Sequence, residues 1–350
     1  MLEVRALGDG AYALVDGSSD VKAKNENGIA APTSGGFIVT PAGIIVVETY
    51  LNDHTACQAR NLIVQTMPNV PIKYVVTTSH HGDHIYGNSV FVAEGVKFVM
   101  HKNTFTSISD EDFLAGEKSF MQGGFGYGGG IQATAPITED MQMLLAGDSD
   151  LDLMLGGDKV VATYFGHAQT PGDQFVWHER SQTLFCGNPI IADGPSMPWL
   201  LDGNVAGAKQ AMVNMKEFVD TKANPVTVVP GHGTPSQNGA YLAGKYIEYH
   251  TELQELAAEA VAAGMNLTQA MAHVVQPDYQ TYTLYGWVQP SINVPFAFVE
   301  AGGKIANGET CGSVCFPAQG HGVHSSTACD HRTSGLRPVI ALTSDRTRGG

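Results

Sequence analysis

The most informative stretch of the chain crowds three histidines and an aspartate into five positions, in the run Thr77-Thr78-Ser79-His80-His81-Gly82-Asp83-His84. A short apolar run at 74–76 precedes it and predicts a buried strand, and a helix can begin at 85–88. Buried imidazoles and a buried carboxylate are destabilising unless they are paired or bind a metal. A strand that ends in this cluster therefore indicates a metal site, against the alternative of a polar turn with solvated histidines.

The composition is that of a globular protein, and it argues against several kinds of partner. Hydrophobic residues make up 43% and charged residues 15% of the 350 positions, and no apolar run reaches the roughly 18 residues that a membrane span needs. The formal charge of -15, with only 19 lysines and arginines, leaves no basic stripe for nucleic acid. We expect no membrane or nucleic-acid partner and a small, neutral, apolar substrate, and we leave a homodimer open.

The two ends of the chain differ from its middle. Residues 1–5 lack the basic and apolar regions of a signal peptide, so a cytoplasmic location is expected unless a leader has been removed. Residues 303–350 are polar and without a sustained period, which predicts a disordered or foreign tail. The cysteines and histidines of that tail fit no common zinc-module spacing well. We therefore assign residues 1–302 to one domain, with a helical and loop extension from about residue 250.

Strands and helices are predicted to recur in the same order in two halves of the chain. Alternation and apolar runs predict strands at 4–15, 35–47, 151–186 and 225–230. Start signals and helical spacing predict helices at 52–67, 203–220 and 238–263. This order predicts an α/β (α+β) fold with two central sheets packed face to face and helices outside. The glycine- and aromatic-rich segment 104–131 is either a lid over the site or an ordinary exposed loop.

Three further places put a candidate ligand, flanked by glycine, close behind an apolar strand. They are His167 in the run 164–173, Asn188 after Phe185-Cys186-Gly187, and His232 after Val228-Val229-Pro230-Gly231. Each position alone is a weak signal. Four such places, counting the cluster at 80–84, are a strong one, because residues at the ends of neighbouring strands converge at one edge of a sheet.

These residues resemble the pattern of the metallo-β-lactamase superfamily, whose αββα sandwich carries its metal at the sheet edge. The leading motif of the family is His-x-His-x-Asp-His, and a His before a Pro-Gly pair, a Gly-Asp pair and a late Gly-His follow it. Here the corresponding segments begin at Ser79, His167, Gly187 and Gly231. The resemblance covers residues 1 to about 250.

The sequence departs from the family pattern at two ligands, which are replaced by Ser79 and Asn188. The first metal site of the family would keep only His81 and His167. Two Zn²⁺ ions would set four positive charges against the single carboxylate of Asp83, whereas one Zn²⁺ with Asp83 and a hydroxide is neutral. We therefore expect one Zn²⁺ per active site, with water in an open position. Its expected ligands are Asp83, His84, Asn188 and His232.

The asparagine ligand makes this set similar to the chlorothalonil hydrolytic dehalogenase branch of the superfamily. That resemblance implies a zinc-dependent hydrolase in which a zinc-bound hydroxide displaces chlorine from an electron-poor aromatic ring. His81 is then the general base, and His81 and Asp83 are the expected catalytic residues. The expected substrate-contacting or supporting residues are Ser79, His167 and Trp199. His80 is expected to point away and is assigned no chemistry.

Other functions fit the same residues. The same hydroxide would hydrolyse a lactone, ester, thioester or β-lactam, although the sequence shows no feature that would stabilise an oxyanion. Loss of two family ligands also fits a degenerate, non-catalytic metal-binding protein. A di-iron redox enzyme is less favoured, because the carboxylate that bridges two metals is replaced by Asn188.

Overall fold

The computed structural model describes residues 1–17, 33–92, 96–110, 113–117, 142–192, 197–222, 224–282 and 284–305. All of these residues belong to the unit Met1–Val314. The predicted tail lies outside the described residues from 306 onward, and so does most of the segment 104–131, which was expected to be either a lid or an exposed loop.

The first sheet has seven strands in the order β1-β2-β3-β4-β5-β6-β7. They are β1 (Leu2–Gly8), β2 (Ala11–Asp16), β3 (Gly35–Thr40), β4 (Gly43–Val47), β5 (Ile72–Val76), β6 (Lys97–His101) and β7 (Gln142–Ala146). Strands β1 to β4 are antiparallel, whereas β4 to β7 are parallel. Because β4 and β5 are parallel neighbours, the residues that follow them lie at the same edge of the sheet.

The second sheet has five strands in the order β12-β11-β10-β9-β8. They are β8 (Leu151–Leu155), β9 (Asp158–Thr163), β10 (Phe175–His178), β11 (Thr183–Gly187) and β12 (Thr227–Pro230). Only β11 and β12 pair in parallel within this sheet, with Gly187 opposite Pro230. The residues that follow these two strands are therefore neighbours as well.

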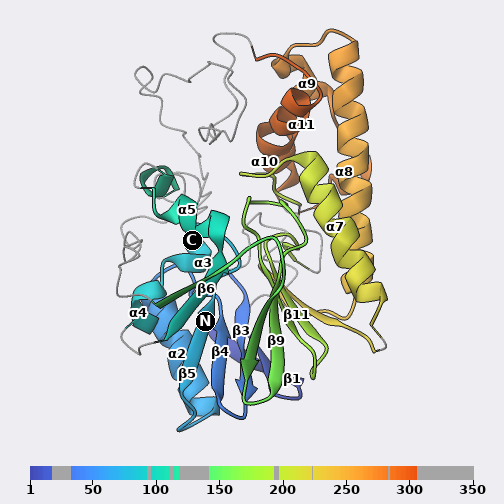
Figure 1. Ribbon diagram of the computed structural model, residues 1–350. Helices are drawn as coiled ribbons and strands as arrows, with labels where there is room; N and C mark the ends of the chain where they lie inside the picture. The colour runs from blue at the N-terminus through green and yellow to red at the C-terminus, as the bar shows by residue number, and fades with distance from the viewer. Residues whose placement is uncertain are drawn as a thin grey trace, which may run out of the picture. The chain divides into compact units, whose positions relative to one another are not determined.

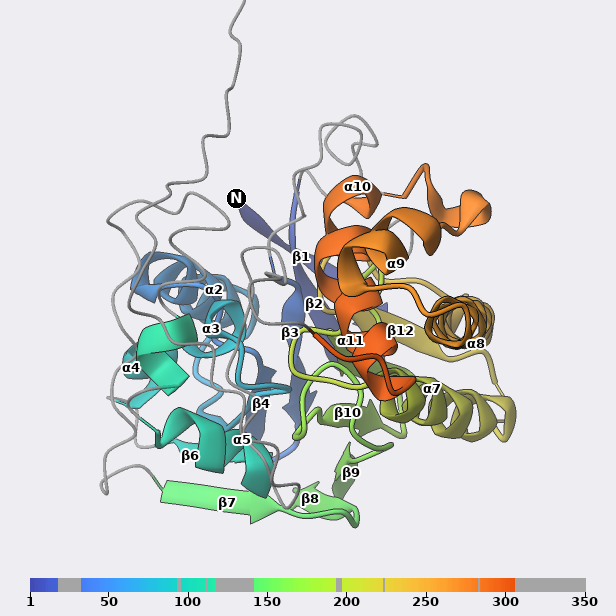
Figure 2. The same ribbon diagram turned by 90° about the horizontal axis from the view of Figure 1, so that it is seen from above.

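The two sheets pack face to face and bury the central core, as expected from the sequence (Figures 1 and 2). The first sheet contributes Ala13, Val15, Ile38, Ile45, Val47, Val76 and Val99, and the second contributes Leu153, Val160, Ala162, Val176, Phe185 and Val229. Both sheets also have apolar outer faces, because nearly all residues of β3, β4, β10 and β11 are buried. Helices must cover these outer faces.

Helices cover both outer faces and complete the αββα sandwich (Figure 2). The first sheet is covered by α2 (Asp53–Thr66), whose N-cap Asn52 accepts a hydrogen bond from Thr55, together with α3 (Gly82–Ile85), α4 (Asn88–Val92) and α5 (Lys102–Ile108). The second sheet is covered by α7 (Val205–Asp220) and α8 (Gly239–Ala262). The bounds of α2, α7 and α8 confirm the predicted helices to within two residues.

The predicted extension adds short helices beyond α8. They are α9 (Leu267–His273), η1 (Pro277–Tyr279), α10 (Tyr285–Val288), η2 (Gln289–Asn293) and α11 (Val294–Glu300). Asn293 donates to the carbonyl of Pro198 at 2.7 Å and accepts from the backbone N–H of Leu200 at 3.1 Å. Glu300 accepts from the backbone N–H of Val205 at 2.7 Å. The extension thus holds the segment that leads into α7.

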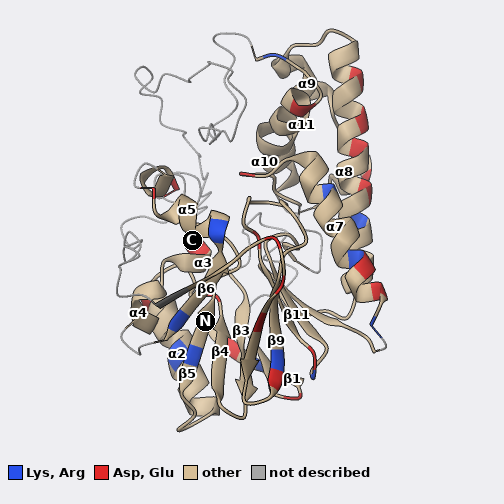
Figure 3. Ribbon diagram, viewed as in Figure 1, with Lys and Arg blue, Asp and Glu red and all other residues tan. Residues whose placement is uncertain are grey.

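Carboxylates recur along the outer side of α8, in keeping with the charge of -15 (Figure 3). Within the described ranges, no helix is long and apolar enough to cross a bilayer.

Candidate metal centre

Four predicted ligands meet where the ends of β5, β11 and β12 come together. Asp83 and His84 lie in α3, which follows the end of β5, and Asn188 comes directly after β11. His232 stands two residues after β12, behind Gly231. A Cβ atom on Gly231 would overlap the side-chain oxygen of Asn188, so this position requires glycine for the two ligand segments to lie side by side.

Three distances between donor atoms of the four side chains are close to those between ligands of one metal ion. The Nε2 atom of His84 lies 3.0 Å from Oδ1 of Asn188 and 3.6 Å from Oδ2 of Asp83, and that Oδ2 lies 3.4 Å from Nε2 of His232. Ligands about 2.0–2.1 Å from a tetrahedral Zn²⁺ lie about 3.3–3.4 Å from one another. Two imidazoles, one carboxylate and one amide oxygen also form a donor set that suits zinc, so the residues fit the ion.

The electrostatics of the cluster favour an ionised carboxylate. Burial alone would raise the pKa of Asp83, but His84, His232, His81 and the Thr33 hydroxyl together lower that pKa to about 2. Burial alone would lower the pKa of His84, but Asp83 and Glu48 raise it to about 9 in the metal-free protein. A metal ion at Nε2 of His84 would therefore have to displace a proton at neutral pH.

Glu48 contacts the ring nitrogen of His84 that faces away from the metal cluster, and this role was not predicted from the sequence. Its Oε1 lies 3.1 Å from Nδ1 of His84, both side chains are fully buried, and the hydroxyl of Thr78 donates to the same Oε1. A carboxylate on Nδ1 leaves Nε2 of His84 for the metal. Glu48 directly follows β4, the parallel neighbour of β5, and that position was the signal that could have found it.

Thr33 joins Asp83 to His232 and was also missed. Its hydroxyl donates to Oδ2 of Asp83 at 2.7 Å, and its backbone pairs with that of His232. Ser34 adds a hydrogen bond from its N–H to the carbonyl of Gly231 at 2.7 Å. Two small hydroxyl residues before a strand carry no distinctive pattern, so the sequence offered no signal for this role.

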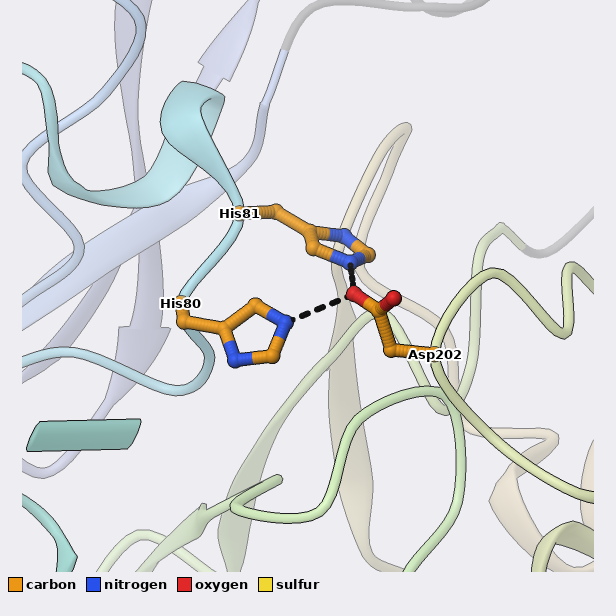
Figure 4. A group of neighbouring side chains, drawn as sticks. All are labelled: His80, His81 and Asp202. Carbon is orange, nitrogen blue, oxygen red and sulfur yellow. Dashed lines mark hydrogen bonds and ion pairs between the residues drawn. The ribbon is translucent and has the colours of Figure 1, made fainter. Parts of the chain in front are cut away.

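A second group is formed by His80, His81 and Asp202 (Figure 4), and His81 connects it to Asn188 of the first group. The Nε2 atom of His80 lies 2.8 Å from Oδ2 of Asp202, and Nε2 of His81 lies 3.4 Å from the same oxygen. The expectation that His80 points away is wrong, because its ring is buried and turned toward Asp202. Asp202 lies in the segment before α7 and does not follow a strand. The sequence pattern that located the other candidate ligands therefore could not locate it.

His81 was predicted as the general base, and it lies between the two groups. Its Nδ1 is 3.4 Å from Nδ2 of Asn188, while its Nε2 faces Asp202. Burial alone would lower the pKa of His81, but Asp202, Glu117 and Asp83 outweigh burial and raise it. The position is compatible with proton transfer at the metal site.

Three residues expected to contact the substrate or support the ligands have different surroundings. His167 does not face the metal cluster: its Nε2 bonds the backbone carbonyl of Asp202 at 2.8 Å. The hydroxyl of Ser79 is buried and lies 3.4 Å from the backbone N–H of His81, which donates to it. Trp199 lines a cavity of about 10 Å³ together with Asn188, and its ring meets Trp287 edge to face.

Two described residues of the segment 104–131 reach the site. The ring of Phe113 lies 4.6 Å from that of His80, and Glu117 accepts a hydrogen bond from the backbone N–H of Gly82 at 2.9 Å. Whether the rest of 104–131 forms a lid stays a prediction.

The charge count made from the sequence was wrong, because Asp83 is not the only carboxylate at the site. Glu48 contacts His84, and Asp202 contacts His81. One Zn²⁺ is formally neutralised by Asp83 and Glu48 without a hydroxide. The number of metal ions therefore stays a prediction, and its support is now the geometry of the donor atoms.

Comparison with known proteins identifies the class. The family described as the Metallo-beta-lactamase superfamily matches residues 29–232, more than half of the chain. The chain belongs to this superfamily. Its fold is that of metal-dependent hydrolases, and the His/Asp groups provide places for a divalent metal, usually zinc in this fold.

Solved structures share the fold at low sequence identity. A stereoselective inverting sec-alkylsulfatase, Pisa1, from Pseudomonas sp. has a TM-score of 0.65 at 16% identity, over 91% of this chain and 52% of the sulfatase chain. A metallo-beta-lactamase from Pontibacter korlensis has a TM-score of 0.53 at 18% identity, over 72% of this chain and 99% of its own. DIM-1 metallo-beta-lactamase has a TM-score of 0.51 at 15% identity, over 71% and 97%. The chain thus spans about half the length of the alkylsulfatase.

Proposed function

We propose that this protein is a hydrolase with one zinc ion bound by Asp83, His84, Asn188 and His232. The observation that carries the proposal is that these four donor atoms form a continuous series, Asn188–His84–Asp83–His232, in which neighbouring atoms lie 3.0–3.6 Å apart. The remaining ligands of the family's first site are dispersed, since Ser79 replaces one histidine and His167 bonds the backbone of Asp202. This favours one ion over two.

The residues around the ion have separable roles in the proposed reaction. When bound, zinc supplies Lewis acidity and lowers the pKa of a coordinated water from its high bulk value to about 7. Asp83 neutralises charge, and Glu48 orients the ring of His84. His81 would accept a proton at Nδ1, the ring nitrogen that lies 3.4 Å from Nδ2 of Asn188 on the side of the metal cluster.

The charge of the surroundings supports a neutral substrate. The groups that set the pKa values of Asp83, His84 and His81 are carboxylates, histidines and neutral polar side chains. An anionic substrate would find no lysine or arginine among those groups to pair with. A neutral, electron-poor carbon is the better target, and hydrolytic dehalogenation of an electron-poor chlorinated aromatic, chlorothalonil-like, is the specific activity proposed.

Metal analysis and paired substrate assays test this function. We expect about one zinc per chain in protein purified without chelator, and chloride release from chlorothalonil exceeding turnover of a chromogenic lactam or lactone. Asn188→Asp should raise zinc binding toward two per chain at saturation, because a carboxylate can bridge two ions. Acyl turnover without chloride release would replace the dehalogenase with an acyl hydrolase. Absence of zinc would favour a non-catalytic protein.

A further inference from the structure

Asn188 has two chemically different ends, and each meets a histidine. Its Oδ1 lies 3.0 Å from Nε2 of His84, and its Nδ2 lies 3.4 Å from Nδ1 of His81. An amide nitrogen donates and does not accept, so the ring nitrogen that faces it must carry a lone pair. If Oδ1 serves the metal, His81 must therefore carry its ring proton on Nε2.

Asp202 stands at that other ring nitrogen. Its Oδ2 lies 3.4 Å from Nε2 of His81 and 2.8 Å from Nε2 of His80, so both rings converge on one oxygen (Figure 4). An ionised carboxylate only accepts hydrogen bonds, so it stabilises a proton on Nε2 and repels a lone pair there. Asn188 at one ring nitrogen and Asp202 at the other thus require the same tautomer of His81.

The backbone of Asp202 is fixed from both sides. Its N–H donates to the carbonyl of Gln169 at 3.1 Å, and its carbonyl bonds Nε2 of His167 at 2.8 Å. The other ring nitrogen of His167 bonds Nδ2 of Asn204 at 3.3 Å. His167, which stands where the family has a metal ligand, is therefore placed to hold Asp202.

We propose that Asp202 is a positioning residue that keeps the proton of His81 on Nε2 and so turns the Asn188 amide with its oxygen toward the metal. The proposal rests on the metal centre proposed above. It gives a reason for asparagine at position 188: an aspartate has no N–H for Nδ1 of His81, so it would need a protonated His81 or a second ion between them. The contacts run from Asp202 through His81 and Asn188 to the metal.

A second metal ion at His80, His81 and Asp202 is the competing assignment, because their donor atoms lie close enough to share one. Metal on Nε2 of His81 would move the ring proton to Nδ1, where it would oppose the N–H of Asn188. The two assignments therefore demand opposite tautomers, and the tautomer can be measured.

Long-range ¹H–¹⁵N correlation spectra of zinc-loaded protein labelled at histidine report which ring nitrogen carries the proton. The signals of His81 are assigned by their loss in His81→Gln. We expect His81 with a proton on Nε2 in the wild type, and a mixture that includes the Nδ1–H form in Asp202→Asn and Asp202→Ala. Asp202→Ala should also weaken zinc binding by about tenfold, the lower end of the effect of removing a group that orients a ligand.

A matched control is available at another buried histidine–aspartate pair. Asp158 lies 3.3 Å from Nε2 of His178 on the second sheet. Asp158→Asn should change the signals of His178 and leave those of His81 and the zinc affinity unchanged. The main observation, the tautomer of His81, is made on the wild-type protein and does not depend on whether any variant folds.

Each outcome decides something. A proton on Nδ1 of His81 in the zinc-loaded wild type overturns the proposal, and so does binding of two zinc ions of which Asp202→Ala loses one. If the wild-type protein binds no zinc, the proposed metal centre itself is wrong. Metal analysis shows this before any spectrum is recorded. The failure of the centre and the failure of Asp202 are thus distinguished.

Discussion

His84 and His81 flank Asn188, and a carboxylate braces each of them, but in opposite senses. Glu48 contacts Nδ1 of His84 and leaves Nε2 for the metal, whereas Asp202 contacts Nε2 of His81 and leaves Nδ1 toward Asn188. The same pairing of residue types therefore serves two purposes. Which ring nitrogen the carboxylate takes decides what the other nitrogen can do.

The two pairs also differ in how firmly the fold holds them. Glu48 and His84 follow neighbouring parallel strands, and both side chains are at most 1% exposed. Asp202 belongs to an irregular segment, and its side chain is 15% exposed. We infer that the Glu48 pair is a fixed part of the metal centre and that the Asp202 pair depends on packing elsewhere.

The largest effect is expected from removing the carboxylate of Asp83, which lies beside the rings of both His84 and His232. Asp83→Ala should reduce zinc from about one per chain to near zero and abolish hydrolysis, because the only anionic ligand is lost. Elemental analysis after gel filtration measures this. Asp152→Ala, at an exposed aspartate on β8, is the control and should keep its zinc. Zinc retained by Asp83→Ala would show that the ligand set is wrong.

The comparison of the two braces predicts unequal losses. Glu48→Gln should weaken zinc binding by about 10–100-fold, since a neutral amide orients His84 less well and adds no charge. Asp202→Asn should weaken it less, because the effect reaches the metal only through His81 and Asn188. Competition with a chromophoric chelator gives both affinities. Equal losses would remove the distinction between a direct and an indirect brace.

Zinc affinity should rise with pH because the ion displaces a proton from His84. The pKa of His84 in the metal-free protein is raised to about 9, above an ordinary value of about 6.5, while that of Asp83 is about 2. Below about pH 9, each unit of pH should therefore raise the apparent affinity up to about tenfold. Calorimetry in buffers of different ionisation enthalpy measures the proton released, and a flat profile from pH 6 to 8 would contradict this assignment.

The metal-free protein should show the opposite dependence in its stability. A raised pKa stabilises the fold while the group is protonated, so the contribution of His84 is complete below about pH 6.5 and is lost as the pH rises through about 9. Urea unfolding of metal-free protein over this range follows it. Stability of the metal-free form that grew between pH 7 and 9 would show that another group dominates.

The sequence predicted the fold, and the proximity of the proposed metal ligands, for the same reason. Asp83, Asn188 and His232 each come shortly after an apolar strand, and parallel neighbours bring such residues together. Glu48 obeys the same rule, but one glutamate after an apolar run has many ordinary explanations. Asp202 could not be found, because its place depends on contacts between an irregular segment and residues nearly a hundred positions later.

Loss of those distant contacts is expected to have the smallest effect on zinc affinity. It also tests how the segment that carries Asp202 is held in place. Asn293 is fully buried and bonds the carbonyl of Pro198 and the N–H of Leu200. Asn293→Ala leaves both backbone groups unpaired, which should cost about 1–3 kcal/mol of stability. Because the displaced segment carries Asp202, zinc binding should weaken by a few-fold as well.

Asn266→Ala separates these two consequences. Asn266 caps α9 through a reciprocal capping box with Gln269, and its loss should cost about 0.5–2 kcal/mol without touching the Asp202 segment. Urea unfolding and chelator competition on both variants give stability and zinc affinity side by side. If the two variants lose similar stability but only Asn293→Ala loses zinc affinity, the extension acts on the site through Asp202. If both keep full zinc affinity, the extension supports the fold alone.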